Sequence, residues 1–257
     1  MKNILAALMF FTRLPFWRIA TVEKEYFKNV VNFWPYAGIV TGGIGAGVML
    51  GASYVFPVTV AVIQGLVARV LVTGALHEDG LADFFDGFGG GTSKEATLRI
   101  MKDSHIGSYG VLGLILYFAL MVALLSSLPV KAAALLFFCG DILCKGVASN
   151  IVNMLPYART EEESKNKLVY NKIPAGAYMA NVGLVLLVLG AAFTLYLPLQ
   201  LSLAVFMPFV VFAFLVMYIN NKIQGYTGDC CGAMFLLCEL SFLMAAVATV
   251  QDRKSVV

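Results

Sequence analysis

Acidic side chains gather in one short segment of a chain that is otherwise mostly apolar. The segment GALHEDGLADFFDGFGGG contains Glu78, Asp79, Asp83 and Asp86. In a helix each residue turns by about 100° around the axis, so Asp79, Asp83 and Asp86 would share one narrow stripe. Glu78 and its neighbour His77 would point elsewhere. Three like charges on one stripe repel each other, and the stripe therefore favours a cationic partner.

A divalent metal ion is the partner that fits such a stripe best. Mg²⁺ prefers oxygen ligands, keeps some of its waters, and is commonly held by one or two carboxylates together with substrate phosphates. A pair of such ions about 4 Å apart can clamp the attacking and leaving oxygens of a phosphoryl displacement. Gly80 and Gly87 would let a diphosphate approach the backbone, and GFGGG at 87–91 could bend the chain around it. The alternative is a solvated acidic loop.

Two further acids lie in the segment GYTGDCCGAMFLLCEL near the end of the chain. Asp229 stands where the last apolar helix is predicted to begin, and a helix N-terminus favours anions. We expect Asp229 to reach the same metal site. Glu239 lies deeper in that helix, where an acid must face protein or water. Glu239 therefore either contacts substrate or pairs with a basic side chain.

Three other charged residues fall inside apolar segments. Asp141 and Lys145 are four residues apart, which places them on one helix face, and we expect them to pair with each other. Arg69 has no such local partner. It is predicted to make either an interhelical pair or a phosphate contact.

The composition predicts an integral membrane protein. The 257 residues are 60% hydrophobic and only 13% charged, with a mean hydropathy of +0.84, whereas soluble domains average about 25% charged residues. Windows of roughly 20 apolar residues, enough to cross a bilayer, recur along the chain. We expect an all-α, polytopic membrane bundle that forms one catalytic domain over residues 1–257. The candidate spans are 34–56, 57–76, 106–128, 131–155, 175–197, 199–220 and 230–250.

The distribution of basic residues predicts the orientation. In a seven-span topology the longer connections, 1–33, 77–105, 156–174 and 221–229, share one side and hold most of the 18 lysine and arginine residues. Cytoplasmic loops carry such an excess, so the acidic segment is expected to face the cytoplasm. The opening MKNILAALMFFTRLPFW lacks a small-residue cleavage site and is predicted to be a retained helix at the membrane interface.

Other partners receive little support from the composition. The net charge is only +3, and no basic cluster interleaved with aromatic residues indicates nucleic acid. The five cysteines show no metal-type spacing and are expected to be buried thiols. Small residues at four-residue spacing in GIVTGGIGAGVMLG predict close helix packing in lipid. A homo-oligomer is compatible with the sequence.

Several motifs together resemble one family. FFTRLPF near the start, HEDGLADFFDGFGG, RIMKDSHIGSYGVLGLIL and GYTGDCCGA resemble adenosylcobinamide-GDP ribazoletransferases, also called cobalamin-5′-phosphate synthases. The similarity runs from the amino-terminal helix to the last span. It implies a multi-pass enzyme of the prokaryotic inner membrane that joins adenosylcobinamide-GDP to α-ribazole or its 5′-phosphate, releases GMP and requires Mg²⁺.

The family motifs, read together with the acidic pattern, give each candidate side chain a role. The expected metal ligands are Asp79, Asp83, Asp86 and Asp229. The expected substrate contacts are Thr12, Arg13, Lys102, Asp103, Arg159, Thr227 and Glu239. Asp83 and His77 are the candidate catalytic residues, with His77 or a metal-bound carboxylate as general base. Gln224 departs from the family pattern, which has a glycine there, and the Asp141/Lys145 pair departs from a more usual arginine.

Two other functions compete with this reading. CDP-alcohol phosphotransferases also use an acidic stripe and Mg²⁺, but their motif ends in an Ala-Arg pair and two later aspartates that this chain lacks. A cation transporter would explain acids inside the membrane. Transporters place their ligands near the midplane and often in repeated halves, whereas no internal repeat is visible here.

Overall fold

Apolar runs without interior breakers form the long helices of the structure. The computed structural model describes residues 2–159 and 168–251, and this part of the chain contains no β-strand. Pro57, Pro129 and Pro198 each stand directly before a helix, where the missing N–H is not needed. The long helices are α3 (Trp34–Ala52), α4 (Val58–Thr73), α7 (Ser108–Ser126), α8 (Val130–Ala148), α10 (Ala175–Leu195), α11 (Met207–Ile223) and α12 (Gly228–Gln251).

Six segments of the described chain are long and apolar enough to cross a membrane. They correspond to six of the seven predicted spans, and the prediction of an all-α, polytopic membrane bundle is confirmed. The remaining span, predicted at 57–76, is only partly correct. Its helix α4 ends at Thr73, and α5 (Leu76–Gly90) continues from it at an angle of 91°, so the two helices are long and apolar enough to cross a membrane only together, as one broken span.

The break between α4 and α5 rests on two successive left-handed residues. Gly74 has φ +66° and Ala75 has φ +58°. Glycine adopts this conformation without strain, whereas an L residue is disfavoured there. Arg13 covers the break: its backbone N–H donates to the oxygen of Val72 at 2.7 Å, and a Cβ on Gly74 would meet the Arg13 side chain. These contacts with the amino-terminal segment thus help to fix the angle between α4 and α5.

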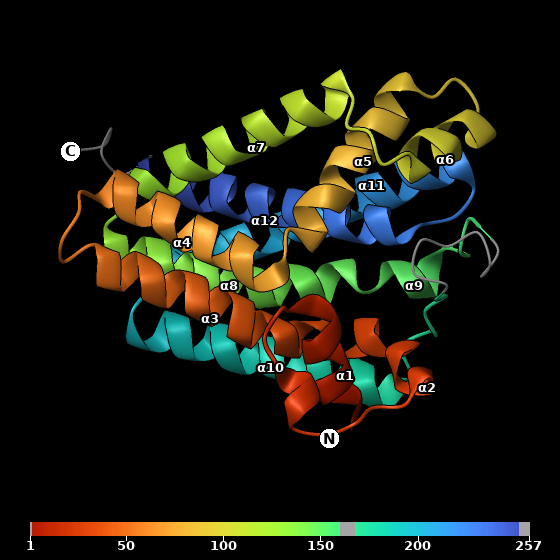
Figure 1. Ribbon diagram of the computed structural model, residues 1–257. Helices are drawn as coiled ribbons and strands as arrows, with labels where there is room; N and C mark the ends of the chain where they lie inside the picture. The colour runs from red at the N-terminus through yellow and green to blue at the C-terminus, as the bar shows by residue number, and fades with distance from the viewer. Residues whose placement is uncertain (1, 160–167, 252–257) are drawn as a thin grey trace.

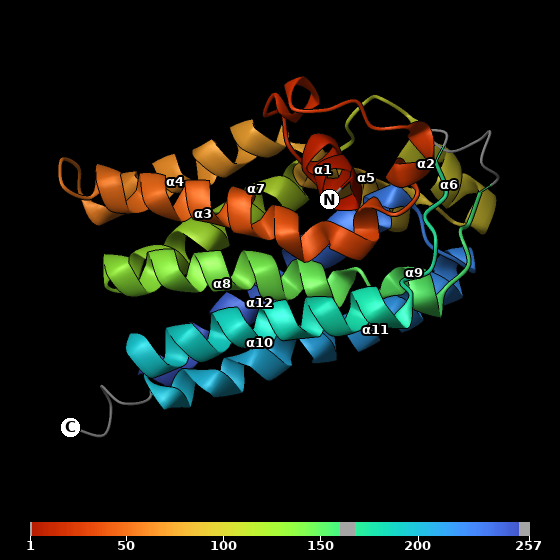
Figure 2. The same cartoon turned by 90° about the horizontal axis from the view of Figure 1, so that it is seen from below.

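The short elements other than η3 lie toward one end of the long helices (Figures 1 and 2). The turn between α3 and α4 lies at the opposite end. This arrangement agrees with the expectation that the long polar connections share one side. The short helices are α1 (Lys2–Phe11), α2 (Lys24–Phe27), α6 (Lys94–Lys102) and α9 (Ile151–Met154), with 3-10 turns η1 (Phe16–Arg18), η2 (Val30–Phe33) and η3 (Leu199–Phe206).

A network of charged side chains crosses the interior of the bundle. Arg69 of α4 donates to Glu239 Oε1 of α12 at 2.5 Å and to Tyr117 Oη of α7 at 2.8 Å. The guanidinium also lies 3.6 Å from Asp141 of α8, which is paired with Lys145 one turn later. All five side chains are buried. The interhelical pair of Arg69 and the pairing of Asp141 with Lys145 were both among the expectations, and they are confirmed.

Gln224 ends α11 in the left-handed conformation, with φ +54°. This explains why glycine would be favoured at the position. We expect Gln224→Gly to raise the free energy of unfolding by about 1 kcal/mol, because glycine removes the cost of a Cβ in this region. Unfolding in detergent by heat or denaturant measures the change. Gln224→Ala also loses the hydrogen bond from Lys94 at 3.4 Å but keeps a Cβ, so it should not raise the free energy of unfolding. An equal increase in both variants would contradict the explanation.

Candidate active site

The acidic segment is helical, as predicted, and it crosses the start of α12 with almost no space between the two backbones. A Cβ on Gly80 would lie 3.0 Å from the backbone oxygen of Asp229, and a Cβ on Gly232 would lie 3.1 Å from that of His77. Only glycine fits such distances without movement of the neighbouring backbone. The expectation that Gly80 admits a diphosphate is therefore wrong, because Gly80 faces α12. The close crossing instead brings Asp229 beside α5.

Two other expectations about the glycines of α5 are also wrong. A Cβ on Gly87 would meet the Met101 side chain at 2.3 Å and the backbone oxygen of Thr97 at 3.1 Å, so Gly87 serves the packing of α6. The GFGGG run does not bend the chain, because α5 continues as a helix to Gly90. Helix packing explains these glycines without a ligand.

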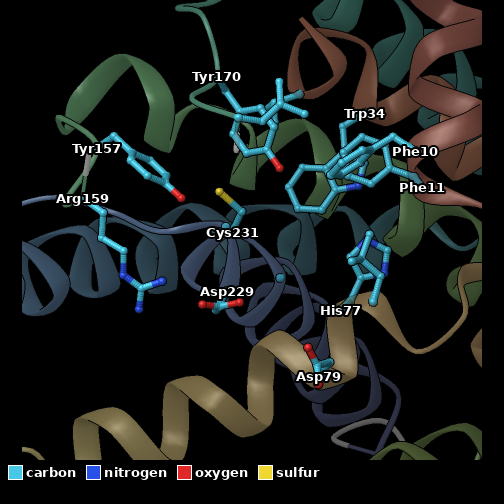
Figure 3. A pocket seen from close by; sticks show the side chains of 15 residues that line it. Phe10, Phe11, Trp34, His77, Asp79, Tyr157, Arg159, Tyr170, Asp229 and Cys231 are labelled. Carbon is cyan, nitrogen blue, oxygen red and sulfur yellow. The ribbon is translucent and has the colours of Figure 1, made fainter. Parts of the chain in front are cut away.

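A pocket that is partly open to solvent lies at the crossing of α5 and α12. Asp79, Asp229 and Arg159 line one part of it, and His77 lines another. Figure 3 shows the carboxylates of Asp79 and Asp229 near the same space, with Arg159 to one side. Asp79 is exposed and Asp229 is half-buried. The structure thus brings together four of the predicted site residues.

Two motifs that are far apart in sequence hold Arg159 in the pocket wall. The Ala158 N–H donates to the backbone oxygen of Tyr226 at 2.8 Å, and the Tyr226 N–H donates to that of Pro156 at 2.9 Å. Beyond this bridge, Arg159 Nη2 donates to the backbone oxygen of Leu98 in α6 at 2.7 Å. The PYAR motif therefore fixes a guanidinium beside the acids, where it can bind an anion.

The three acids of the predicted stripe lie in different environments. Asp79 is exposed, Asp83 is half-buried one turn later, and Asp86 is buried. The Asp86 carboxylate accepts hydrogen bonds from the N–H groups of Gly107 at 2.7 Å and Gly110 at 2.8 Å. These groups form the start of α7, so Asp86 caps that helix and interacts favourably with its dipole. The role of Asp86 as a metal ligand stays a prediction, whereas its capping role is visible.

The acids fit a metal ion that binds together with a substrate. Asp79 and Asp229 offer carboxylate oxygens, the donors that Mg²⁺ prefers. Within residues 2–159 and 168–251, however, no three His, Cys, Asp or Glu side chains lie close enough to hold a metal ion by themselves. Mg²⁺ commonly completes its six-coordinate shell with water and substrate phosphate. The donor set is therefore suited to an ion shared with a diphosphate.

Three of the predicted substrate contacts use their polar atoms within the protein. Thr12 Oγ1 donates to the backbone oxygen of Leu8 at 2.6 Å, where α1 has just ended. Thr227 Oγ1 accepts from the Cys230 N–H at 3.3 Å and caps α12. Glu239 is fully buried in the interior network, and it does not line the pocket. The observed contact of Glu239 is its buried ion pair with Arg69.

The remaining predicted contacts lie on exposed surface. Lys102 and Asp103 follow one another at the end of α6, and both are exposed. Asp103 accepts from the backbone N–H of His105 at 3.0 Å and lies 2.7 Å from its Nδ1. These hydrogen bonds lower the pKa of the Asp103 carboxyl. Arg13 is also exposed and lies against Gly74 rather than in the pocket lining.

The opposite part of the pocket is lined by aromatic rings, of which Phe10, Phe11 and His77 lie in the motifs quoted above and Trp34 and Tyr170 do not. Phe11 and Trp34 stack with ring centroids 5.1 Å apart, and Trp34 and His77 stack at 5.6 Å. Phe10 and Tyr170 extend this lining, and they meet edge to face at 6.2 Å. Aromatic residues make up 12% of the chain and mostly serve the apolar spans. Their spacing alone could not single out these five, which we call the aromatic wall.

The chain is similar along nearly its whole length to known proteins. The family model described as cobalamin-5-phosphate synthase matches residues 3–247. A relative from Leptothrix cholodnii is 35% identical over 95% of this chain and 94% of its own, and one from Shewanella amazonensis is 36% identical over 93% and 92%. Both are named adenosylcobinamide-GDP ribazoletransferase. No solved structure matches the chain.

Proposed function

Because the chain belongs to the cobalamin-5-phosphate synthase family, we propose that it joins adenosylcobinamide-GDP to α-ribazole or its 5′-phosphate and releases GMP. This reaction belongs to the last steps of nucleotide-loop assembly in cobalamin biosynthesis. One observation carries the assignment to a site: Asp79 and Asp229 line the same pocket as Arg159. A diphosphate substrate requires acids that hold a metal ion and a basic side chain that binds phosphate oxygens.

The proposed step is a phosphoryl transfer. A secondary ribose hydroxyl of ribazole (2′ or 3′) attacks, because the 5′ oxygen already carries the phosphate when the 5′-phosphate is the acceptor. Its oxygen forms a bond to the phosphorus next to cobinamide, and the bond from that phosphorus to the oxygen bridging to GMP breaks. GMP leaves with the electron pair of this bond. A bound Mg²⁺ would neutralise charge on the diphosphate. Asp79 and Asp229 would hold the ion together with the diphosphate, and Arg159 would bind outer phosphate oxygens.

The attacking hydroxyl must also lose its proton, and α5 offers two kinds of acceptor. His77 stacks on Trp34 and meets the ring of Phe235 edge to face at 5.0 Å. This position in the aromatic wall favours ring contacts over proton transfer. We therefore assign the proton to a carboxylate of α5, with Asp83 as the first candidate, because it lies one helical turn beyond Asp79.

The pocket is proposed to open to the cytoplasm from the inner membrane of a prokaryotic cell. The excess of lysine and arginine in the long polar connections supports this orientation. The short helices toward one end of the bundle support a single functional face. A transporter is less well supported, because the charged side chains in the interior pair with one another.

A test of the function follows directly. Membranes that contain the protein are expected to release GMP from adenosylcobinamide-GDP only when Mg²⁺ and either α-ribazole or its phosphate are present. Ca²⁺ should replace Mg²⁺ poorly, because it is larger and takes looser coordination by six to eight oxygens. Nucleotide release is measured by chromatography. Release of CMP from a CDP-alcohol, with no response to the corrinoid, would establish the alternative phosphotransferase function instead.

A further inference from the structure

The aromatic wall lies in the same pocket as the acids but has a different chemistry. The rings of Phe11, Trp34 and His77 are nearly parallel, with interplanar angles of 14° between Phe11 and Trp34 and 23° between Trp34 and His77. These three rings are buried against one another, and the half-buried rings of Phe10 and Tyr170 extend the lining, so a flat ring that enters the pocket can pack against aromatic side chains. Figure 3 shows these rings on one side of the pocket and the carboxylates of Asp79 and Asp229 on another. One pocket therefore offers a place for a flat ring beside a place for phosphate.

The wall is assembled and fixed by contacts between distant segments. Phe11 ends α1, Trp34 begins α3 and His77 lies in the first turn of α5. Tyr170 joins them from a connecting segment, which is held by hydrogen bonds from Asn171 to the backbone oxygen of Lys28 at 2.8 Å and to Asn29. Aromatic packing alone would not require four separate segments to meet beside the acids.

Two side chains of the wall also retain a polar group that has no partner. Trp34 Nε1 and His77 Nε2 are buried and form no hydrogen bond within the described residues. An unpaired buried polar group lowers stability. Phenylalanine would avoid this cost at the Trp34 position, so the indole is better explained by binding than by packing.

On the basis of the proposed function, we infer that the aromatic wall binds the base of the acceptor nucleoside, α-ribazole. This base is a benzimidazole, which is flat and largely apolar, and it suits a lining of aromatic faces. Guanine of the donor has polar groups around most of its edge, whereas the edge of a benzimidazole is largely hydrocarbon and suits the apolar side chains that surround the wall. With the base on the wall, the ribose is directed toward the acids.

Tryptophan fluorescence tests this inference without measuring turnover. The chain has two tryptophans, and Trp17 is 56% exposed whereas Trp34 is 1% exposed. In the Trp17→Phe variant, emission reports on Trp34 alone. Addition of α-ribazole, with no Mg²⁺ or corrinoid, is expected to change this emission in a saturable way. The variant Trp17→Phe/Trp34→Phe supplies the background, and GMP should leave the emission unchanged.

Kinetics provide the second measurement. Base stacking on an aromatic side chain is worth a factor of about 5 to 150 in binding. Trp34→Leu and Phe11→Leu are therefore expected to raise the KM for α-ribazole roughly tenfold and to leave the KM for adenosylcobinamide-GDP unchanged. Phe214→Leu is the matched control, because Phe214 is 62% exposed and lies outside the pocket.

The outcomes separate this inference from the proposed function. If GMP is released normally but α-ribazole leaves the Trp34 emission unchanged, the wall does not bind the base and the inference is wrong. A response to GMP in place of α-ribazole would assign the wall to guanine and would also overturn it. If no GMP is released under any condition, the proposed function fails, whereas the emission still shows whether the nucleoside binds.

Discussion

Asp79→Asn is expected to lower the turnover number by a factor of about 100 or more, because a lost metal ligand removes several kcal/mol of transition-state stabilisation. Asp79 is exposed in the pocket, and its carboxylate has the same charge as nearby Asp83. Removal of one charge also relieves repulsion between them. In the absence of Mg²⁺ the variant should therefore be at least as stable as the original protein. GMP release and thermal unfolding in detergent measure the two properties.

The control for this variant is Glu95→Gln, which makes the same change of charge on an exposed residue of α6 outside the pocket. It is expected to retain full activity. Asp86→Asn provides a second comparison, because Asp86 caps α7. This variant should lose about 1–3 kcal/mol of stability, as expected when hydrogen bonds to a buried carboxylate are broken. Full turnover by Asp79→Asn would show that the metal site is elsewhere.

Arg69→Met is expected to lower the free energy of unfolding by about 3–5 kcal/mol, the range seen when one partner of a buried ion pair is removed. The guanidinium contacts Glu239 and Tyr117 and lies near Asp141. Its loss leaves a buried carboxylate without a counter-charge, and the membrane interior offers little water to replace it. Denaturation of the purified protein in detergent measures the change.

The double variant Arg69→Met/Glu239→Leu separates the ion pair from the packing. It removes both charges, and apolar pairs of similar volume often replace buried ion pairs with little loss. Most of the lost stability should therefore return. Arg99→Met is the control for the charge itself, because Arg99 is exposed on α6, and it should unfold like the original protein. If the double variant were as unstable as Arg69→Met, shape rather than charge would explain the role of Arg69.

Much of the fold follows from patterns that depend on local sequence. Long apolar runs require helices in lipid, and the prolines mark where most of the turns occur. The break after α4 is the main exception. Its second left-handed residue is Ala75, which has no local preference for that conformation. Contacts with the distant Arg13 segment select it, and a span predicted from hydropathy alone continues past the break.

The parts of the candidate site that depend on local sequence could also be predicted. Helical spacing placed Asp79, Asp83 and Asp86 on one helix, and the helix exists. Spacing could not show that Asp86 faces the start of α7, because that depends on how α7 packs. Nor could it show the aromatic wall, since Phe11 and Trp34 resemble the apolar residues around them. Their roles depend on contacts between segments rather than on residue type.

The crossing of α5 and α12 also determines when the protein can first become active during synthesis. A ribosome delivers the amino-terminal helices early and α12 last. Until α12 has entered the bilayer, Gly80 has no backbone to pack against, and Asp229 is absent from the pocket. A nascent chain that stops before residue 228 therefore has the acidic helix but no complete site. A chain that is still being inserted therefore lacks one wall of the candidate site.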